Sequence, residues 1–71
     1  MIFANATVDV IDEPPAHGQG LGKFRVTVYG KPPHDYVRIY EIQGKSDNVV
    51  AREGLDRFVD DITRLLEAKG N

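Results

Sequence analysis

Histidine and serine are the first side chains to consider as a base, a nucleophile or a metal ligand in this 71-residue sequence, which contains no cysteine. His17 and His34 fall in two different predicted turns, about 25 Å apart at ~3.3 Å per strand residue, so they cannot share a metal ion within one chain. Ser46 is the only serine and precedes a predicted helix, where serine commonly acts as the N-cap. We therefore predict no catalytic residue, no metal site and no cofactor. An enzyme that shares a metal through His34 across a dimer is the alternative.

Two further patterns resemble chemical sites and are better explained structurally. The run Gly18-Gln19-Gly20-Leu21-Gly22 has the composition of a phosphate loop. Such loops open a helix, whose N–H groups meet the phosphate, whereas this run opens a strand, and we interpret it as a flexible hairpin loop. The neighbouring acids Asp60 and Asp61 are predicted to lie on the outer, solvated face of a helix.

Tyrosines and arginines on one sheet face point to binding, because these residue types are enriched at binding hot spots. In residues 23–29, Phe24, Val26 and Val28 alternate with basic and polar side chains. The facing of residues 36–43 is ambiguous: if Val37 and Ile39 face the core, all three tyrosines lie on the uncovered face. The predicted partner-binding residues are then Lys23, Arg25, Tyr29, Tyr36, Arg38 and Tyr40.

The elements that position these residues follow from the periodicity. Alternating apolar residues predict strands over residues 2–11, 23–29 and 36–43, and the proline- and glycine-rich segment 12–22 predicts a long loop. Apolar residues at three- and four-residue steps predict one amphipathic helix over residues 47–69. We expect one α+β domain over residues 1–71, a three-stranded antiparallel meander with the helix on one face.

The predicted helix carries its own start and stop signals. Ser46 or Asp47 can serve as the N-cap, and Gly70 stands where a glycine typically follows a helix. Gly54 lowers helix propensity in the middle of the apolar stripe, which predicts a close approach of helix and sheet there.

Composition limits the partners. The net charge of −2 argues against bulk attraction to nucleic acid or to an anionic membrane, and no apolar run is long enough to span a bilayer. The N-terminus lacks the pattern of a secretory signal, and we expect a cytoplasmic protein. A protein partner is the leading prediction, with nucleic acid as the alternative and a homodimer favoured by the uncovered sheet.

The stretch from Glu13 to Leu55 resembles part of a double-stranded RNA-binding domain. The similarity rests on the loop Pro15-Ala16-His17, the strand Phe24 to Val28, and Gly44-Lys45-Ser46 before the helix. The resemblance implies the strand and helix topology and RNA binding through the first loop. The helix here begins with Asp47 where that family places lysines.

The layout also resembles small phage-encoded anti-CRISPR proteins of the type I-F group. The corresponding segments are Val8-Asp9-Val10, Pro14-Pro15, Phe24 to Val28, and Gly44 to Asp47. This resemblance implies an inhibitor that docks on a CRISPR effector complex without chemistry.

Overall fold

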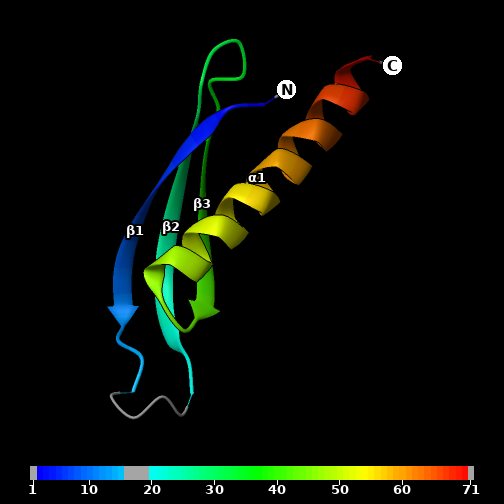
Figure 1. Cartoon of the computed structure of the whole chain (residues 1–71). Coiled ribbons are helices and arrows are strands. Elements are labelled where there is room, and N and C mark those ends of the chain that lie inside the picture. Colours follow the sequence, from blue (N-terminus) through cyan, green and yellow to red (C-terminus); the bar gives the residue numbers. More distant parts are fainter. Residues whose placement is uncertain (1, 16–19, 71) are drawn as a thin grey trace.

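The computed structural model describes residues 2–15 and 20–70. It contains the strands β1 (Ala4–Asp12), β2 (Gly22–Gly30) and β3 (Val37–Gly44), followed by the helix α1 (Asp47–Gly70). The strands form one antiparallel sheet in the order β1-β2-β3, and α1 crosses one face of it (Figure 1). The predicted α+β meander with a C-terminal helix is confirmed, and the element bounds differ from the expected ones by two residues at most.

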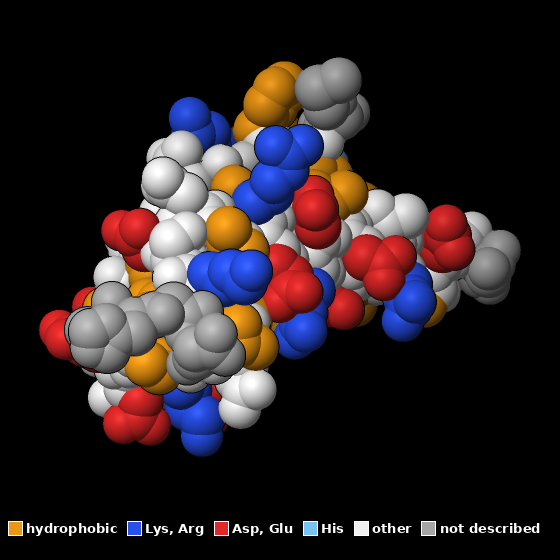
Figure 2. All heavy atoms as spheres, turned by 60° about the horizontal axis from the view of Figure 1, so that its bottom comes forward, with side chains coloured by type: hydrophobic (Ala, Val, Ile, Leu, Met, Phe, Trp, Pro, Cys, Tyr) orange, Lys and Arg blue, Asp and Glu red, His pale blue; other side chains and the backbone are white. Residues whose placement is uncertain are grey.

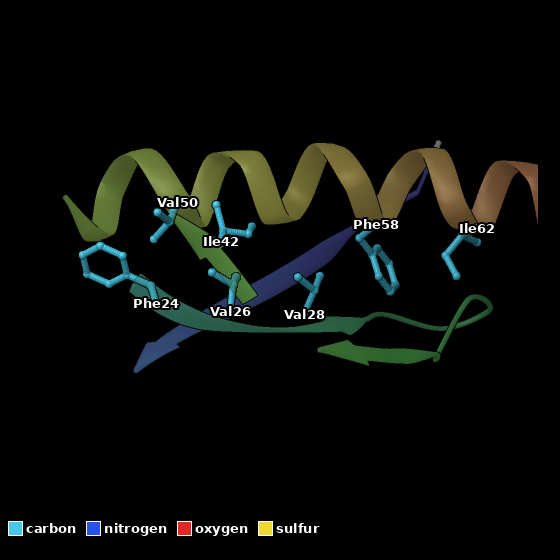
Figure 3. Close-up of a cluster of buried hydrophobic side chains, with 7 residues drawn as sticks. All are labelled: Phe24, Val26, Val28, Ile42, Val50, Phe58 and Ile62. Atoms are coloured by element: carbon cyan, nitrogen blue, oxygen red, sulfur yellow. The ribbon is translucent and has the colours of Figure 1, made fainter. Parts of the chain in front are cut away.

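The core forms where the central strand meets the helix. Phe24, Val26 and Val28 alternate along β2 with exposed or half-buried residues, and all three lie beneath α1. The remaining buried side chains come from β3 and from α1 at helical spacing: Ile42, Val50, Phe58 and Ile62 (Figure 3). Burial of one such side chain contributes about 1.5–3 kcal/mol, so this small cluster is the main source of the fold's stability.

Ser46 caps α1. Its hydroxyl oxygen accepts a hydrogen bond from the Val49 N–H at 3.4 Å, and its carbonyl accepts the first helical bond, from Val50, at 3.2 Å. This is the bonding of an N-cap residue, so of the two predicted caps Ser46 holds the position. The prediction for the other end is wrong, because Gly70 is the last residue of the helix and does not follow it.

Gly54 brings the helix backbone onto the central strand. A Cβ atom built on Gly54 would lie 2.6 Å from Cγ1 of Val26, well inside van der Waals contact. The predicted close approach is confirmed, and its partner is a core residue of β2.

Of the two facings that the sequence left open for β3, the structure has the one with Tyr40 and Ile42 toward the helix, not the one on which the predicted binding site depends. The register places Tyr40 beside Val26 and Ile42 beside Phe24, so the even-numbered residues of β3 lie on the helix side. Val37 and Ile39 lie on the uncovered face instead. The physical reason is that Glu41 shares their side of the strand, and an inward orientation would desolvate its carboxylate in an apolar core.

We expect Gly54→Ala to destabilise the protein by up to about 2 kcal/mol, measured as the free energy of unfolding in urea. Alanine gains about 1 kcal/mol of helix propensity, but the new methyl group displaces Val26, and overpacking of this kind typically costs about 1–3 kcal/mol.

Gly70→Ala is the matched control, because nothing lies within 4 Å of a Cβ atom at that position. Its stability should be unchanged or slightly raised. Equal effects of the two substitutions would contradict the close contact at Gly54.

Candidate functional site

The sheet surface opposite α1, the open face, is the candidate site. The register aligns its side chains in rows across the three strands, such as Asn5–Tyr29–Val37 and Thr7–Thr27–Ile39. Of the predicted binding residues, Lys23, Arg25 and Tyr29 lie on the open face. Tyr36, Arg38 and Tyr40 do not. Arg38 and Tyr40 lie beside the core residues Val28 and Val26 on the helix side of the sheet, and Tyr36 continues that side just before β3. The structure therefore divides the predicted site between two surfaces.

One end of the open face is apolar. Tyr29 and Val37 are direct cross-strand neighbours, and Ile39 follows in the next row. Phe3 continues the alternation of β1 on this side, and its carbonyl accepts a hydrogen bond from the Lys31 N–H at 2.8 Å. We call these four residues the apolar patch; their exposed fractions are 59% for Phe3, 45% for Tyr29, 50% for Val37 and 62% for Ile39. Large side chains of this kind grouped on a surface typically mark a binding site.

The other end of the open face is charged with both signs. Arg25 lies between Asp9 on β1 and Glu41 on β3, and its Nη2 is 3.8 Å from the Glu41 Oε1. Both side chains of this pair are at least half exposed, so the ion pair contributes little to stability. Lys23 in turn lies opposite Asp12. Lys23 and Arg25 thus each have an acidic neighbour across the strands.

Three of the four apolar-patch residues, Phe3, Val37 and Ile39, were missed from the sequence. The available signal was Glu41, which shares a side of its strand with Val37 and Ile39 and therefore favours solvent for all three. Phe3 shares its side of the first strand with Asn5 and Thr7, which are also exposed. Polar residues on these two strands thus indicate the open face more reliably than the apolar ones do.

Tyr40 joins β3 to the helix. Its hydroxyl donates a 2.6 Å hydrogen bond to Oδ2 of Asp61. Burial, followed by this bond and the negative charge of Asp61, raises the pKa of Tyr40 from 10.0 to about 12, while Arg38 and Arg57 act in the opposite direction. Asp61 is half-buried against the sheet, so its prediction as an outer, solvated acid is wrong. Asp60 is exposed and pairs with Arg64 at 3.0 Å.

Tyr36 lies in a similar position nearer the end of the helix. Lys69 of α1 donates to its hydroxyl at 3.3 Å, and the Arg38 guanidinium lies 5.7 Å from its ring centre. Cation–π contacts at exposed sites contribute about 0.5–1 kcal/mol. Tyr36 and Tyr40 thus fasten the helix to the edge of the sheet.

The backbone of the outer strands adds a second feature. The Gly30 N–H bonds the Tyr36 carbonyl, so the even-numbered residues of β3 bond β2. In an antiparallel pair the alternate residues point their N–H and C=O groups away from the neighbour. In β3 these are Val37, Ile39, Glu41 and Gln43. The Val37 carbonyl accepts a 2.9 Å bond from the Arg38 side chain.

The residues considered for catalysis do not come together in the described part of the chain. His34 is half-buried in the turn before β3, and His17 lies outside the described residues, as do Gly18 and Gln19 of the glycine-rich run. Gly22 begins β2, as predicted for a run that opens a strand. Among residues 2–15 and 20–70, no three metal-ligating side chains form a group and no pocket is present. The absence of enzymatic activity stays a prediction.

The outer face of α1 is mostly charged, with Val49 and Val59 exposed among its polar residues. Arg57 pairs with Glu53 at 3.6 Å, and Figure 2 shows blue and red side chains interleaved over the surface that the helix forms. For the described residues, no helix combines the length and the apolar character needed to cross a lipid bilayer. The interleaved charges favour a solvated surface over a site for one charged ligand.

Comparison of the chain with protein-family models, with curated proteins and with solved structures finds no match. The two resemblances in the sequence therefore remain predictions. The end of β1 and the start of β2, which flank the first connection, lie at the same end of the sheet as the start of α1 (Figure 1), which is the arrangement of elements that the RNA-binding resemblance implies.

The stabilising effect of Tyr40 is expected to disappear at high pH. Because its pKa is raised in the folded state, to about 12 from 10.0, its contribution is fully present below about pH 10 and is lost as the pH rises toward 12. The difference in unfolding free energy between the natural protein and Tyr40→Phe, measured in urea at each pH, should shrink over this range.

Asp61→Asn provides the control for this titration. It removes the negative charge beside Tyr40 and should lower the folded-state pKa of the phenol, so that the loss still begins near pH 10 but ends at a lower pH and is smaller in total. A difference that stays constant from about pH 8 to 12 would show that Tyr40 and Asp61 do not interact as described.

Proposed function

We propose that this protein is a non-catalytic binding module whose apolar patch on the open face contacts a protein partner. The observation that carries the proposal is the grouping of Phe3, Tyr29, Val37 and Ile39 at one end of a sheet that α1 leaves uncovered. Aromatic residues at the centre of an interface with a polar rim are typical of protein recognition. Here Asp9, Arg25 and Glu41 lie beside the patch and supply such a rim.

A rigid support favours this function. Tyr29 extends from the central strand, which bonds to a neighbour on both sides, so its backbone is held before any partner arrives. Preorganised side chains lose little conformational freedom on binding, which leaves more of the contact energy as affinity.

The resemblance to type I-F anti-CRISPR proteins names one partner to test, the CRISPR effector complex of that type. In this proposal the protein is a phage or mobile-element inhibitor that covers a surface of the complex with its open face. Binding of the purified complex to the immobilised protein tests it directly.

Nucleic acid is the second candidate partner. Lys23, Arg25 and Tyr29 lie on the same side of β2, an arrangement that lets a base stack on the ring while phosphates contact the basic groups. Asp9, Asp12 and Glu41 oppose it, because each lies across from one of the two basic residues.

The protein-binding proposal is tested by affinity capture with matched double variants. The natural chain is incubated with a lysate of cells that express it, and the retained proteins are quantified by mass spectrometry. Phe3→Ser with Tyr29→Ser removes exposed apolar area from the patch, and specific partners should be reduced roughly tenfold or more, as expected for hot-spot residues.

The control is Val49→Ser with Val59→Ser on α1, whose side chains are 56% and 42% exposed and so match Phe3 and Tyr29. It should retain partners at the natural level. Equal losses in both double variants would remove the apolar patch as the contact surface.

The nucleic-acid alternative predicts binding to single-stranded RNA or DNA that weakens as salt rises, with Arg25→Gln weaker than the natural protein. Each phosphate that the protein neutralises releases counterions and contributes about 0.7 to the magnitude of the slope of log affinity against log salt for single strands. We expect no measurable slope, because the acidic neighbours offset the basic residues. A slope of one or more would favour nucleic acid over a protein partner.

A further inference from the structure

We propose that the free edge of β3 pairs antiparallel with β3 of a second copy of this chain, which joins two sheets into one of six strands. The twofold axis passes midway between the two Ile39 residues, which therefore lie opposite each other. The proposal concerns the edge of the sheet, whereas the proposed function concerns its face, and each can hold without the other.

The first argument is the difference between the two edges. In β3 the pairing with β2 keeps one register from Gly44 to Val37, and the strand contains neither proline nor lysine. Its outward N–H and C=O groups are therefore in line for another strand. β1 has a register shift between Val10 and Asp12 and is followed by Pro14 and Pro15. Bulges and prolines are common devices against edge pairing, so β3 is the more open edge.

The second argument concerns the register of the two paired β3 strands. Repulsion between like charges excludes some of the possible registers. Outward residues must oppose outward residues, and an axis at Arg38 or at Glu41 would place two like charges directly opposite, which is unfavourable. An axis at Tyr40 would place each Ile39 opposite a Glu41 carboxylate. An axis at Ile39 places the two exposed Ile39 side chains together, leaves no like-charged pair opposed, and places each Val37 opposite a Glu41; unlike an axis at Tyr40, it therefore gives one apolar pair at its centre.

The same register is favourable on the helix side. It places Arg38 opposite Tyr40 of the second copy in a non-hydrogen-bonded pair, where Cα atoms are only about 4.5 Å apart. Arg38 already lies over the Tyr36 ring within one chain. In the dimer the Val37 carbonyl bonds the added strand, so the Arg38 guanidinium no longer donates to it. The guanidinium can then contact the ring of Tyr40 in the second copy, a favourable cation–π contact.

The third argument is surface area. The chain exposes 5130 Å², whereas a folded monomer of 7.9 kDa is expected to expose about 4,400 Å². Its radius of gyration is 13.8 Å, compared with about 11 Å for a typical domain of this length. The excess of roughly 700 Å² reflects an elongated chain, with extents of 49 × 19 × 17 Å, which leaves surface available for an interface of the usual ~800 Å² per partner.

The oligomeric state tests the proposal. Sedimentation equilibrium of the natural protein should show the mass of two chains as concentration rises. Ile39→Lys places two ammonium groups opposite each other and should weaken dimerisation roughly tenfold or more. Thr7→Lys is the matched control, because Thr7 occupies the same row at the opposite edge, and it should dimerise like the natural chain.

Cross-linking tests the register, since the chain has no cysteine of its own. In the proposed dimer the two Cα atoms of residue 39 are about 5.5 Å apart, within disulfide reach. Ile39→Cys should form a covalent dimer under mild oxidation, and Glu41→Cys and Thr7→Cys should not. Circular dichroism checks that each variant is folded, which is expected because all three side chains are exposed.

Three results would overturn the proposal: a natural protein that stays monomeric at high concentration, equal effects of Ile39→Lys and Thr7→Lys, or equal cross-linking at positions 39, 41 and 7. Failure of the proposed function is recognised separately. Phe3→Ser with Tyr29→Ser should reduce capture of a foreign partner roughly tenfold or more and leave the dimer intact, because neither side chain is on β3.

Discussion

The contact between Gly54 and Val26 is the constraint on which the other features of the structure depend. Because the glycine has no side chain, the helix backbone comes down onto the central strand and its neighbours Val50 and Phe58 reach the core on either side. A single helix placed in this way covers one face of three strands and cannot cover the other. The open face, the two free edges and the small core all follow from that position.

A core of this size needs support at its margins, and the tyrosines of β3 provide it. Tyr40 and Tyr36 lie where the helix overlies the edge of the sheet, with rings against the core and hydroxyl groups at the boundary with water. Tyrosine suits such a position because its ring can be buried while its hydroxyl keeps a polar partner. Asp61 and Lys69 of α1 supply these partners. Two residues that sequence analysis assigned to recognition are therefore used to hold the helix.

The sequence was sufficient for the fold and for part of the site. The alternation in β2 is unambiguous, so Lys23, Arg25 and Tyr29 could be placed on the open face from the sequence. In β3 both sides carry apolar residues, and the six-residue connection that precedes the strand does not fix its register from sequence. Its facing is determined by a tertiary balance: Ile42 fills the core beside Phe24, and Glu41 remains in water beside Arg25. Val37 and Ile39 are exposed as a consequence. The candidate site therefore moves from the tyrosines and Arg38 of this strand to the apolar patch on the open face.

The facing of β3 also explains why its free backbone groups and its exposed apolar side chains belong to the same residues. A strand shows its two sides in alternation, and in β3 the residues whose backbone groups point away from β2 are the ones whose side chains lie on the open face. In β1 the relation is reversed: Ala4, Ala6 and Val8 point their backbone groups outward while their side chains pack toward the helix. A ligand that bonds the edge of β3 therefore also meets Val37 and Ile39, whereas a ligand on the edge of β1 meets small, half-buried residues. Backbone pairing and apolar contact can reinforce each other at only one of the two edges, and this asymmetry gives the sheet a preferred side for association.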